Sequence, residues 1–217
     1  PYTKYLIKKN SNEITNVRTG EVLPANTKIV GIRSGTLVGD GQSYGQNQRI
    51  AYSGLDRNCL QDAPLYLVKF AEVDFLRAEG ALRGWNMGGS AQFFYERGIR
   101  NAYLEEPDYV YEYKDLVDTY MQREQPIAYV QSDPMGDGAD WQSVTKIGVK
   151  WNDADSKETK LEKIITQKYI ALFPLSTEAW TELRRTGYPK CFAVHNTSDG
   201  DGSIATVSYT PLKMPSK

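Results

Sequence analysis

The sequence has few of the residues on which nucleophilic catalysis, disulfide frameworks and metal sites depend. It contains 1 histidine and 2 cysteines. A Ser–His–Asp or Cys–His arrangement would have to use His195 with Cys191, only four residues earlier on an irregular segment, and we do not expect one. Cys59 and Cys191 share no CxxC spacing and are too few for a disulfide framework or a four-ligand zinc site. We therefore expect buried free thiols.

Long apolar runs and an excess of one charge are also missing. No stretch approaches the roughly 20 apolar residues that a membrane-spanning helix requires. The 26 Lys+Arg residues balance 27 Asp+Glu residues, which leaves a formal net charge of -1. There is no excess positive charge to release counterions from a nucleic acid or to hold an anionic membrane. We expect no nucleic-acid partner and no membrane-spanning segment.

Motifs for metals, cofactors and hydrolysis are incomplete. Asp153 and Asp155 begin like a calcium loop, but Lys157 and Glu158 stand where a ligand and the turn glycine should be. The glycine loop at residues 39–45 is followed by no helix that could face a phosphate. A glycosidase needs two carboxylates roughly 5 to 10 Å apart, whereas most acids here lie in turns or at helical spacing from Lys or Arg. We assign no catalytic residue, metal or cofactor, although spacing alone leaves a hydrolase open.

The pattern of the chain changes near residue 62. Residues 1–61 mix glycines with short β-branched runs and have no helical period, which predicts an irregular segment of loops and short strands within the same domain. Residues 62–217 carry helical patterns, beginning with Asp62 as a candidate N-cap and Pro64 in the first turn. We expect a mainly all-α fold of tetratricopeptide-like αα-hairpins, with long irregular loops and minor short strands.

The first helix pair is expected over residues 65–84 and 90–104. In the first helix, apolar residues recur at steps of three and four, at Val68, Ala71, Phe75, Ala78, Leu82 and Trp85. The short turn between the helices makes them antiparallel, and Gly98 lets their axes approach closely. Ion pairs at helical spacing are expected within the first helix, namely Asp74 with Arg77 and Glu79 with Arg83.

The second helix pair is expected over residues 160–173 and 177–186. Thr159 and Glu162 have the spacing of a capping box, and Gly187 follows the second helix as a C-cap. The stretch between the two pairs contains one short helix and a polar loop, and a short strand is expected near the end of the chain. These three elements are placed at residues 116–123, 131–143 and 206–209.

The polar residues of the second pair have structural roles in this interpretation. Trp180 and Arg184 stand at i,i+4, so the guanidinium can lie across the indole, and Arg185 can reach carbonyls at the helix end. Gln167 and Lys168 would form a polar layer between helices. We expect Trp180 to be a core residue whose replacement by Ala costs roughly 3 to 5 kcal/mol.

Two segments go beyond a generic helical pattern. The first is FAEVDFLRAEGALRGW at residues 70–85, together with YERGI at 95–99. The second is LEKIITQKYIALF at residues 161–173, followed by EAW at 178–180 and RRTGYP at 184–189. These blocks, in their order and separation, resemble the SusD/RagB family. The resemblance covers about residues 65 to 190 well and the flanks weakly.

The resemblance implies a function as well as a fold. Members are all-helical nutrient-binding proteins that are lipid-anchored in the outer membrane and exposed at the cell surface. They capture oligosaccharides, and in some members peptides, without cleaving them, and they are partnered with a SusC-like TonB-dependent transporter. The family's N-terminal helices and acylated cysteine have no counterpart in this sequence. We therefore expect the C-terminal portion of a longer chain.

Aromatic residues in loops are the candidate ligand contacts. Trp141 follows a polar, glycine-rich segment that is unsuited to a core, so we expect its indole to stack on a sugar ring. Trp151 and Tyr44 come next, with Asp140 and Arg57 as hydrogen-bonding neighbours. One alternative is that the Trp141 indole folds back to cover helices. Another is that the whole chain is a helical-repeat scaffold for protein interactions that does not contact nutrient.

Overall fold

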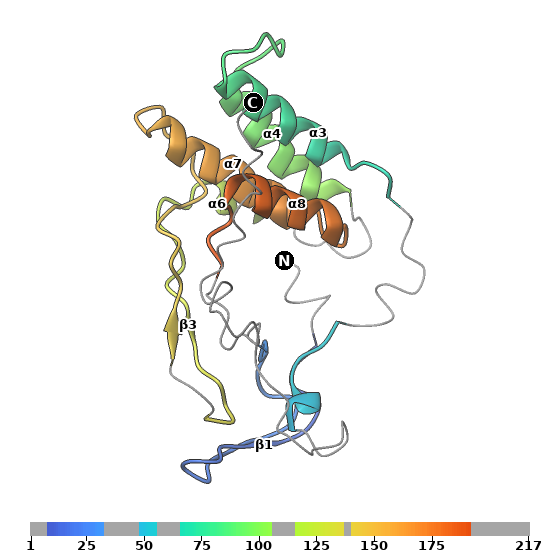
Figure 1. Cartoon of the computed structure of the whole chain (residues 1–217), viewed down its shortest axis with the longest axis vertical. Coiled ribbons are helices and arrows are strands. Elements are labelled where there is room, and N and C mark those ends of the chain that lie inside the picture. The colour runs from blue at the N-terminus through green and yellow to red at the C-terminus, as the bar shows by residue number, and fades with distance from the viewer. Residues whose placement is uncertain (1–7, 33–47, 56–65, 106–115, 137–139, 192–217) are drawn as a thin grey trace, which may run out of the picture. The chain divides into compact units, whose positions relative to one another are not determined.

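Two compact units make up the chain (Figure 1). The computed structural model describes residues 8–32, 48–55, 66–105, 116–136 and 140–191. One unit, here called the hairpin unit, comprises residues 1–63, 128–143 and 192–208. The other, the helical unit, comprises residues 64–127, 144–191 and 209–217. In the described part of the chain, no helix is long and apolar enough to cross a membrane.

The helical unit is built around an antiparallel pair, α3 (Phe70–Leu82) and α4 (Ala91–Leu104) (Figure 1). The Ser90 side chain accepts a hydrogen bond from the Phe93 N–H at 3.1 Å and so caps α4. At the start of α3, the Lys69 N-cap makes no side-chain capping bond. Glu105, just after α4, instead accepts the Ala71 N–H at 2.6 Å, which places a carboxylate at the positive end of the helix.

A close contact between the two helices sets their separation. A Cβ on Gly98 would lie 2.9 Å from the ring of Phe75 on α3, so a glycine is needed where the helices cross. Phe75, Phe94, Tyr95 and Ile99 are all buried around this point. The expected role of Gly98 is therefore confirmed.

Among the described residues, three further helices belong to the helical unit: α6 (Val117–Met121), α7 (Lys157–Ala171) and α8 (Ser176–Thr186). The capping box expected at Thr159 is wrong, because the Ser156 side chain accepts the Thr159 N–H at 3.0 Å and α7 begins earlier. Gly187 ends α8 in the left-handed region, with φ 75°, as expected. The mainly helical fold class is confirmed.

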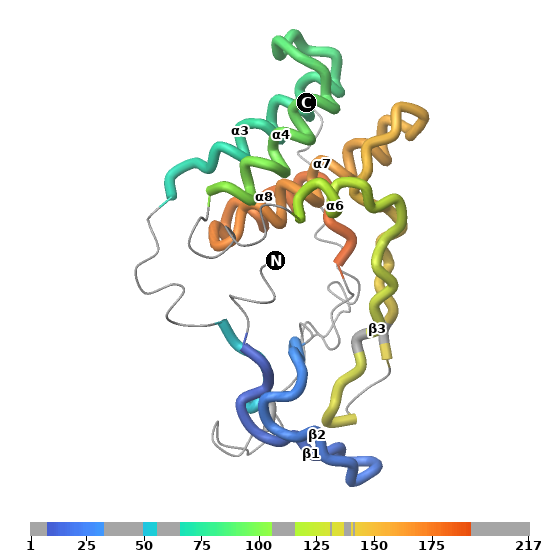
Figure 2. Tube along the Cα trace, turned by 180° about the vertical axis from the view of Figure 1, so that it is seen from behind, coloured from blue at the N-terminus to red at the C-terminus, as the bar shows by residue number. Residues whose placement is uncertain are grey.

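Within its described residues, the hairpin unit contains two small antiparallel sheets (Figure 2). One pairs β1 (Ile14–Thr15) with β2 (Val22–Leu23), and the other pairs β3 (Val130–Gln131) with β4 (Trp141–Gln142). A short 3-10 helix, η2 (Gln48–Ala51), lies beside β1. An apolar cluster among the described residues of this unit contains the buried side chains of Ile14, Val30, Ala51 and Tyr52, with Leu23 and Met135 partly buried against it.

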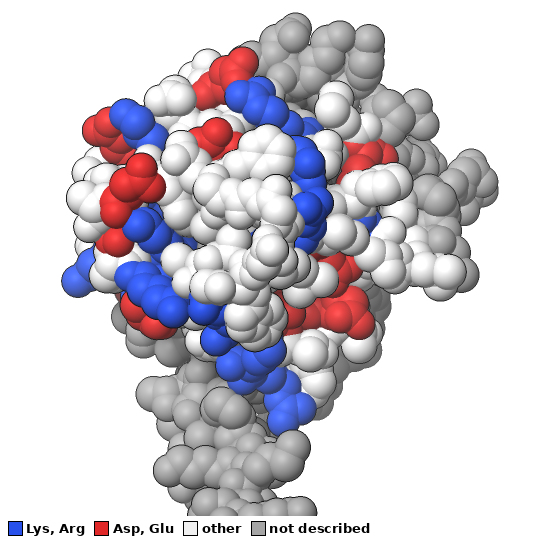
Figure 3. All heavy atoms as spheres, turned by 90° about the horizontal axis from the view of Figure 1, so that it is seen from above, with Lys and Arg blue, Asp and Glu red and all other residues white. Residues whose placement is uncertain are grey.

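Several residues expected in the core are exposed. Val68 precedes α3, which begins at Phe70, and Trp85 follows the helix, which ends at Leu82, so neither lies on the buried helical face. Trp180 is also exposed, because the buried side of α8 carries Ala179 and Glu182 instead. Seen from the end at which α3 and α4 are joined, the surface shows an area of residues other than Lys, Arg, Asp and Glu, with residues of both charges around it (Figure 3).

Other expectations are corrected or fall outside the described residues. The expected Asp74–Arg77 pair is absent. The Arg97 Nε lies 3.0 Å from each carboxylate oxygen of Asp74 and donates to them. Arg77 instead donates to the Met87 carbonyl. The expected Glu79–Arg83 pair is present. Cys191 is exposed rather than buried. Some positions named in the sequence analysis lie outside the described residues, among them Cys59, Asp62, Pro64, His195 and the strand expected at 206–209.

Candidate functional site

A network of charged side chains joins α3, α7 and α8. Arg185 donates to both carboxylate oxygens of Glu79, at 2.7 and 2.6 Å, and also to Glu182 at 2.6 Å. The buried Lys168 ammonium donates to Glu182 at 2.8 Å and lies 3.5 Å from Glu72. Each buried charge thus has an opposite partner, which burial requires. The polar layer expected at Lys168 is confirmed, whereas Arg185 contacts carboxylates rather than the expected carbonyls.

The pKa values of Glu79 and Arg185 are shifted so that both groups stay charged. Burial alone would raise the pKa of Glu79, but hydrogen bonds from Arg185 and Arg83 outweigh it and lower the pKa below the usual value. Hydrogen bonding to Glu79 raises the pKa of Arg185 in turn, and Glu182 adds to this effect. Neither group changes its charge near neutral pH. The Glu79–Arg185 ion pair therefore stays charged on both sides and holds α3 to α8.

Trp151 lies in the helical unit, on the irregular segment before α7. Its Nε1 donates to Asp153 Oδ1 at 3.0 Å, and its ring centroid lies 5.2 Å from that of Tyr95. The Lys160 ammonium is 5.7 Å from the indole ring and donates to the Asp153 carbonyl at 2.7 Å. Tyr95 is buried and donates to the Val149 carbonyl at 2.6 Å. The indole is thus oriented by its neighbours and remains only partly buried.

Asp140 and Trp141 lie in the hairpin unit. Trp141 opens β4 and is paired with Gln131 of β3, and Asp140 precedes it on the exposed surface. Tyr129, half-exposed beside β3, accepts at its carbonyl the Ser143 N–H at 2.8 Å. Sequence reasoning missed Tyr129 as a candidate. The β-branched and aromatic residues that precede the polar loop were the available signal for a hairpin.

The structure brings together only some of the predicted ligand residues. Asp140 and Trp141 are adjacent in one unit, whereas Trp151 belongs to the other. Tyr44 and Arg57 lie outside the described residues. The assignment of these residues to a ligand site therefore stays a prediction.

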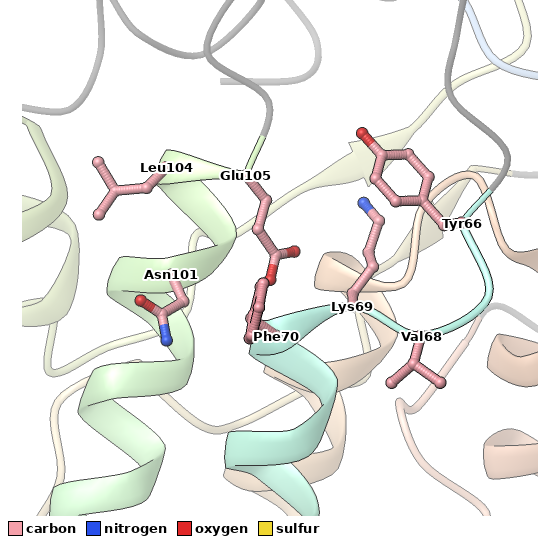
Figure 4. Close-up of a pocket in the computed structure, with 7 residues that line it drawn as sticks. All are labelled: Tyr66, Val68, Lys69, Phe70, Asn101, Leu104 and Glu105. Atoms are coloured by element: carbon pink, nitrogen blue, oxygen red, sulfur yellow. The ribbon is translucent and has the colours of Figure 1, made fainter.

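A pocket of about 520 Å³ opens where α3 begins and α4 ends (Figure 4). Figure 4 shows Tyr66, Val68 and Lys69 on one side and Asn101 and Leu104 on the other, with Phe70 and Glu105 between them. Two of the polar side chains that line the pocket are hydrogen-bonded within the protein. The Lys69 ammonium donates to the Phe173 carbonyl at 2.7 Å, and the Asn101 amide donates to Asp74 at 2.7 Å. Sequence reasoning did not anticipate this pocket.

Within residues 8–32, 48–55, 66–105, 116–136 and 140–191, no group of three or more His, Cys, Asp or Glu side chains is arranged to hold a metal ion.

These features define a class: a mainly helical protein of antiparallel hairpins, held by a buried ion network, with aromatic residues on irregular segments. Residues 3–216 match the family model described as SusD-like, "Susd and RagB outer membrane lipoprotein". The chain therefore belongs to the SusD/RagB family, as the two sequence blocks predicted.

Solved structures of SusD homologues share this fold. A chitin-binding SusD homologue from Flavobacterium johnsoniae is 32% identical, with a TM-score of 0.69 over 92% of this chain and 36% of that chain. A SusD homologue from Bacteroides uniformis is 36% identical, with a TM-score of 0.68 over 90% of this chain and 35% of that chain. The chain thus spans little more than a third of the length of these relatives. No curated protein matches the chain.

Proposed function

We propose that this protein captures an oligosaccharide at the outer-membrane surface, without cleaving it, and delivers it to a SusC-like TonB-dependent transporter. The observation that carries the proposal is the likeness to the chitin-binding homologue over 92% of the chain. The family description as an outer membrane lipoprotein supports the location. Anchoring would occur through a lipid on the N-terminal part of a longer chain.

The proposed contacts follow the chemistry of a sugar ring. Its C–H face stacks on a flat aromatic surface, while its hydroxyls need charged or polar partners. Trp141, Trp151 and Tyr44 would supply the rings, and Asp140 and Arg57 would bond the hydroxyls. For Trp151, the neighbouring Tyr95 and Asp153 fix the orientation of the indole, and a pre-oriented ring loses little freedom on binding.

Capture without cleavage is supported by the state of the carboxylates. A glycosidase needs one carboxylic acid with a raised pKa that can protonate the leaving group. The pKa of Glu79 is lowered, and so is that of Glu124, which accepts a hydrogen bond from Lys150. The lowered pKa values mean that Glu79 and Glu124 are ionised partners of basic side chains rather than proton donors.

A glycan array probed with the full-length protein tests the proposal. Selective retention of one class of oligosaccharide, including chitin fragments among the probes, is the expected result. A reducing-sugar assay on the retained glycan should show no new chain ends. An array on which no glycan is retained would contradict capture and favour an interaction scaffold, and newly formed reducing ends would indicate a hydrolase.

A further inference from the structure

The β3–β4 hairpin exposes residues on both of its faces (Figure 1). Successive residues of a strand lie on opposite faces of a ladder. Tyr129, just before β3, is 50% exposed, and Val130, the first residue of β3, is 49% exposed. Gln142 of β4, which pairs with Val130, is exposed as well. Burial in a core therefore does not account for the aromatic residue at position 129.

The register of the hairpin places two aromatic residues on one face. Residues paired across an antiparallel ladder share a face, and every second residue along a strand returns to it. Trp141 pairs with Gln131. The Ser143 N–H donates to the Tyr129 carbonyl at 2.8 Å, which makes these two residues the next pair on the same face. We call these four residues the hairpin platform: Tyr129, Gln131, Trp141 and Ser143.

Aromatic and polar residues alternate on the hairpin platform. Trp141 stands directly across from Gln131, and Tyr129 stands across from Ser143. A sugar ring needs a flat apolar surface for its C–H face and polar groups for its hydroxyls, and each of these pairs contains both residue types. All four residues are uncharged, whereas Asp140, next to Trp141 in the sequence, is acidic. The platform therefore suits a neutral sugar better than an anionic one.

The spacing of the two aromatic positions suits a chain of sugar units. Tyr129 and Trp141 are diagonal neighbours, and such positions lie roughly 7 to 8 Å apart in an antiparallel pair. One sugar ring cannot cover both positions, so each aromatic residue takes a different unit. The Tyr129 backbone is held at its carbonyl by the Ser143 N–H and at its N–H by Ser143 Oγ, at 3.4 Å. A platform held in this way loses little freedom on binding.

We propose that the hairpin platform binds two units of one linear, neutral oligosaccharide, with Tyr129 as a stacking residue beside Trp141. The proposal rests on the proposed capture function and adds to it a ligand residue and the shape of the glycan. Tyrosine and tryptophan are suited to this role because they offer a large, rigid surface with few rotatable bonds. The platform lies within residues 128–143 of the hairpin unit, so it does not include Trp151.

Isothermal titration of the full-length protein with neutral, linear hexasaccharides tests the proposal. The probes are the hexamers of cellulose, xylan, mannan, amylose and chitin, and the wild-type protein should bind at least one of them. Against that hexasaccharide, Tyr129→Ile should weaken binding about tenfold, because isoleucine keeps the preference for a strand but has no flat ring. Tyr129→Phe keeps the ring and should stay within about twofold of wild type.

Val130→Ala is the matched control, because Val130 is as exposed as Tyr129 and lies on the opposite face of the same hairpin. This variant should bind the hexasaccharide within about twofold of wild type. Urea unfolding of each variant separates a loss of binding from a loss of structure. The matching monosaccharide covers one aromatic position only, so it should bind at least about tenfold less tightly than the hexasaccharide.

The outcomes separate this proposal from the capture function on which it rests. Unchanged affinity in folded Tyr129→Ile would overturn the platform and leave glycan capture intact. Equal losses for Tyr129→Ile and Val130→Ala, or a monosaccharide that binds as tightly as the hexasaccharide, would overturn it as well. A wild-type protein that binds none of the five hexamers, but retains an anionic or branched glycan on the array, would overturn the platform alone. Retention of no glycan at all would overturn both proposals.

Discussion

Arg185 donates hydrogen bonds to both carboxylate oxygens of Glu79, joining the last turn of α8 to the last turn of α3. The planar guanidinium matches the two oxygens of a carboxylate, so this pairing specifies geometry as well as charge. The same guanidinium reaches Glu182 on its own helix. Arg185 therefore links α3 to α8 directly, beside the indirect link that Lys168 of α7 makes to Glu72 and Glu182.

Replacing Arg185 with Ala should lower the free energy of unfolding by about 2 kcal/mol, because the buried Glu79 carboxylate keeps only Arg83 as a partner. Arg184→Ala is the matched control. Its guanidinium lies 4.6 Å from the exposed Trp180 ring, and the change should cost about 0.5 to 1 kcal/mol. Urea unfolding measures both variants, and equal losses would contradict the role given to Arg185.

The free energy of unfolding should decrease at acidic pH, in part because Glu79 becomes protonated. Its pKa is lowered in the folded protein from the usual value of 4.5, mainly by hydrogen bonds from Arg185 and Arg83 that outweigh the effect of burial, so the unfolded chain binds a proton more readily. The stabilisation from Glu79 is therefore present above the unfolded pKa and is lost as the pH falls through the folded pKa. Glu79→Gln cannot titrate, so its free energy of unfolding should decline less steeply below about pH 4.5. Parallel declines for both proteins would argue against this linkage.

Trp180 and Phe94 should differ in their contributions to stability. Trp180 is 46% exposed, whereas Phe94 is 0% exposed, beneath the Arg77 guanidinium. We expect Trp180→Ala to cost about 1 kcal/mol and Phe94→Ala about 3 to 5 kcal/mol. Thermal unfolding of the two variants checks the order. A loss for Trp180→Ala as large as that for Phe94→Ala would restore the core role first expected from sequence.

The sequence predicted helices better than it predicted which faces are buried. Local signals such as Ser90 before α4 and Gly187 after α8 act within one turn, so helix boundaries there were predictable. The burial of Asp74 and Glu79 depends on partners 23 and 106 residues away, which no local pattern shows. For the same reason, Phe70 and Trp180 could not be recognised as exposed.

Ligand residues were harder to predict than helices. Trp141, which opens β4, lies outside any helical periodicity, so no pattern predicts its neighbours. Chemical type alone suggested Trp151, and only the structure reveals that Asp153 and Tyr95 hold its indole. Val68 was expected in the core because an apolar residue at helical spacing normally faces it.

The two tryptophans proposed for sugar stacking should give different results when replaced. Trp141→Ala should weaken binding of the array-selected oligosaccharide about tenfold, or roughly 1.4 kcal/mol, without lowering the free energy of unfolding. Trp151→Ala should weaken binding and also lower the free energy of unfolding by about 2 kcal/mol, because its indole packs on Tyr95. Unchanged affinity in folded Trp141→Ala would remove Trp141 from the site.

The most direct test of oligosaccharide capture is isothermal titration of the full-length protein with the array-selected oligosaccharide, followed by chromatography of the recovered glycan. The account predicts saturable binding and a glycan recovered at its original length. Absence of saturable binding, or recovery of shortened products, would contradict it.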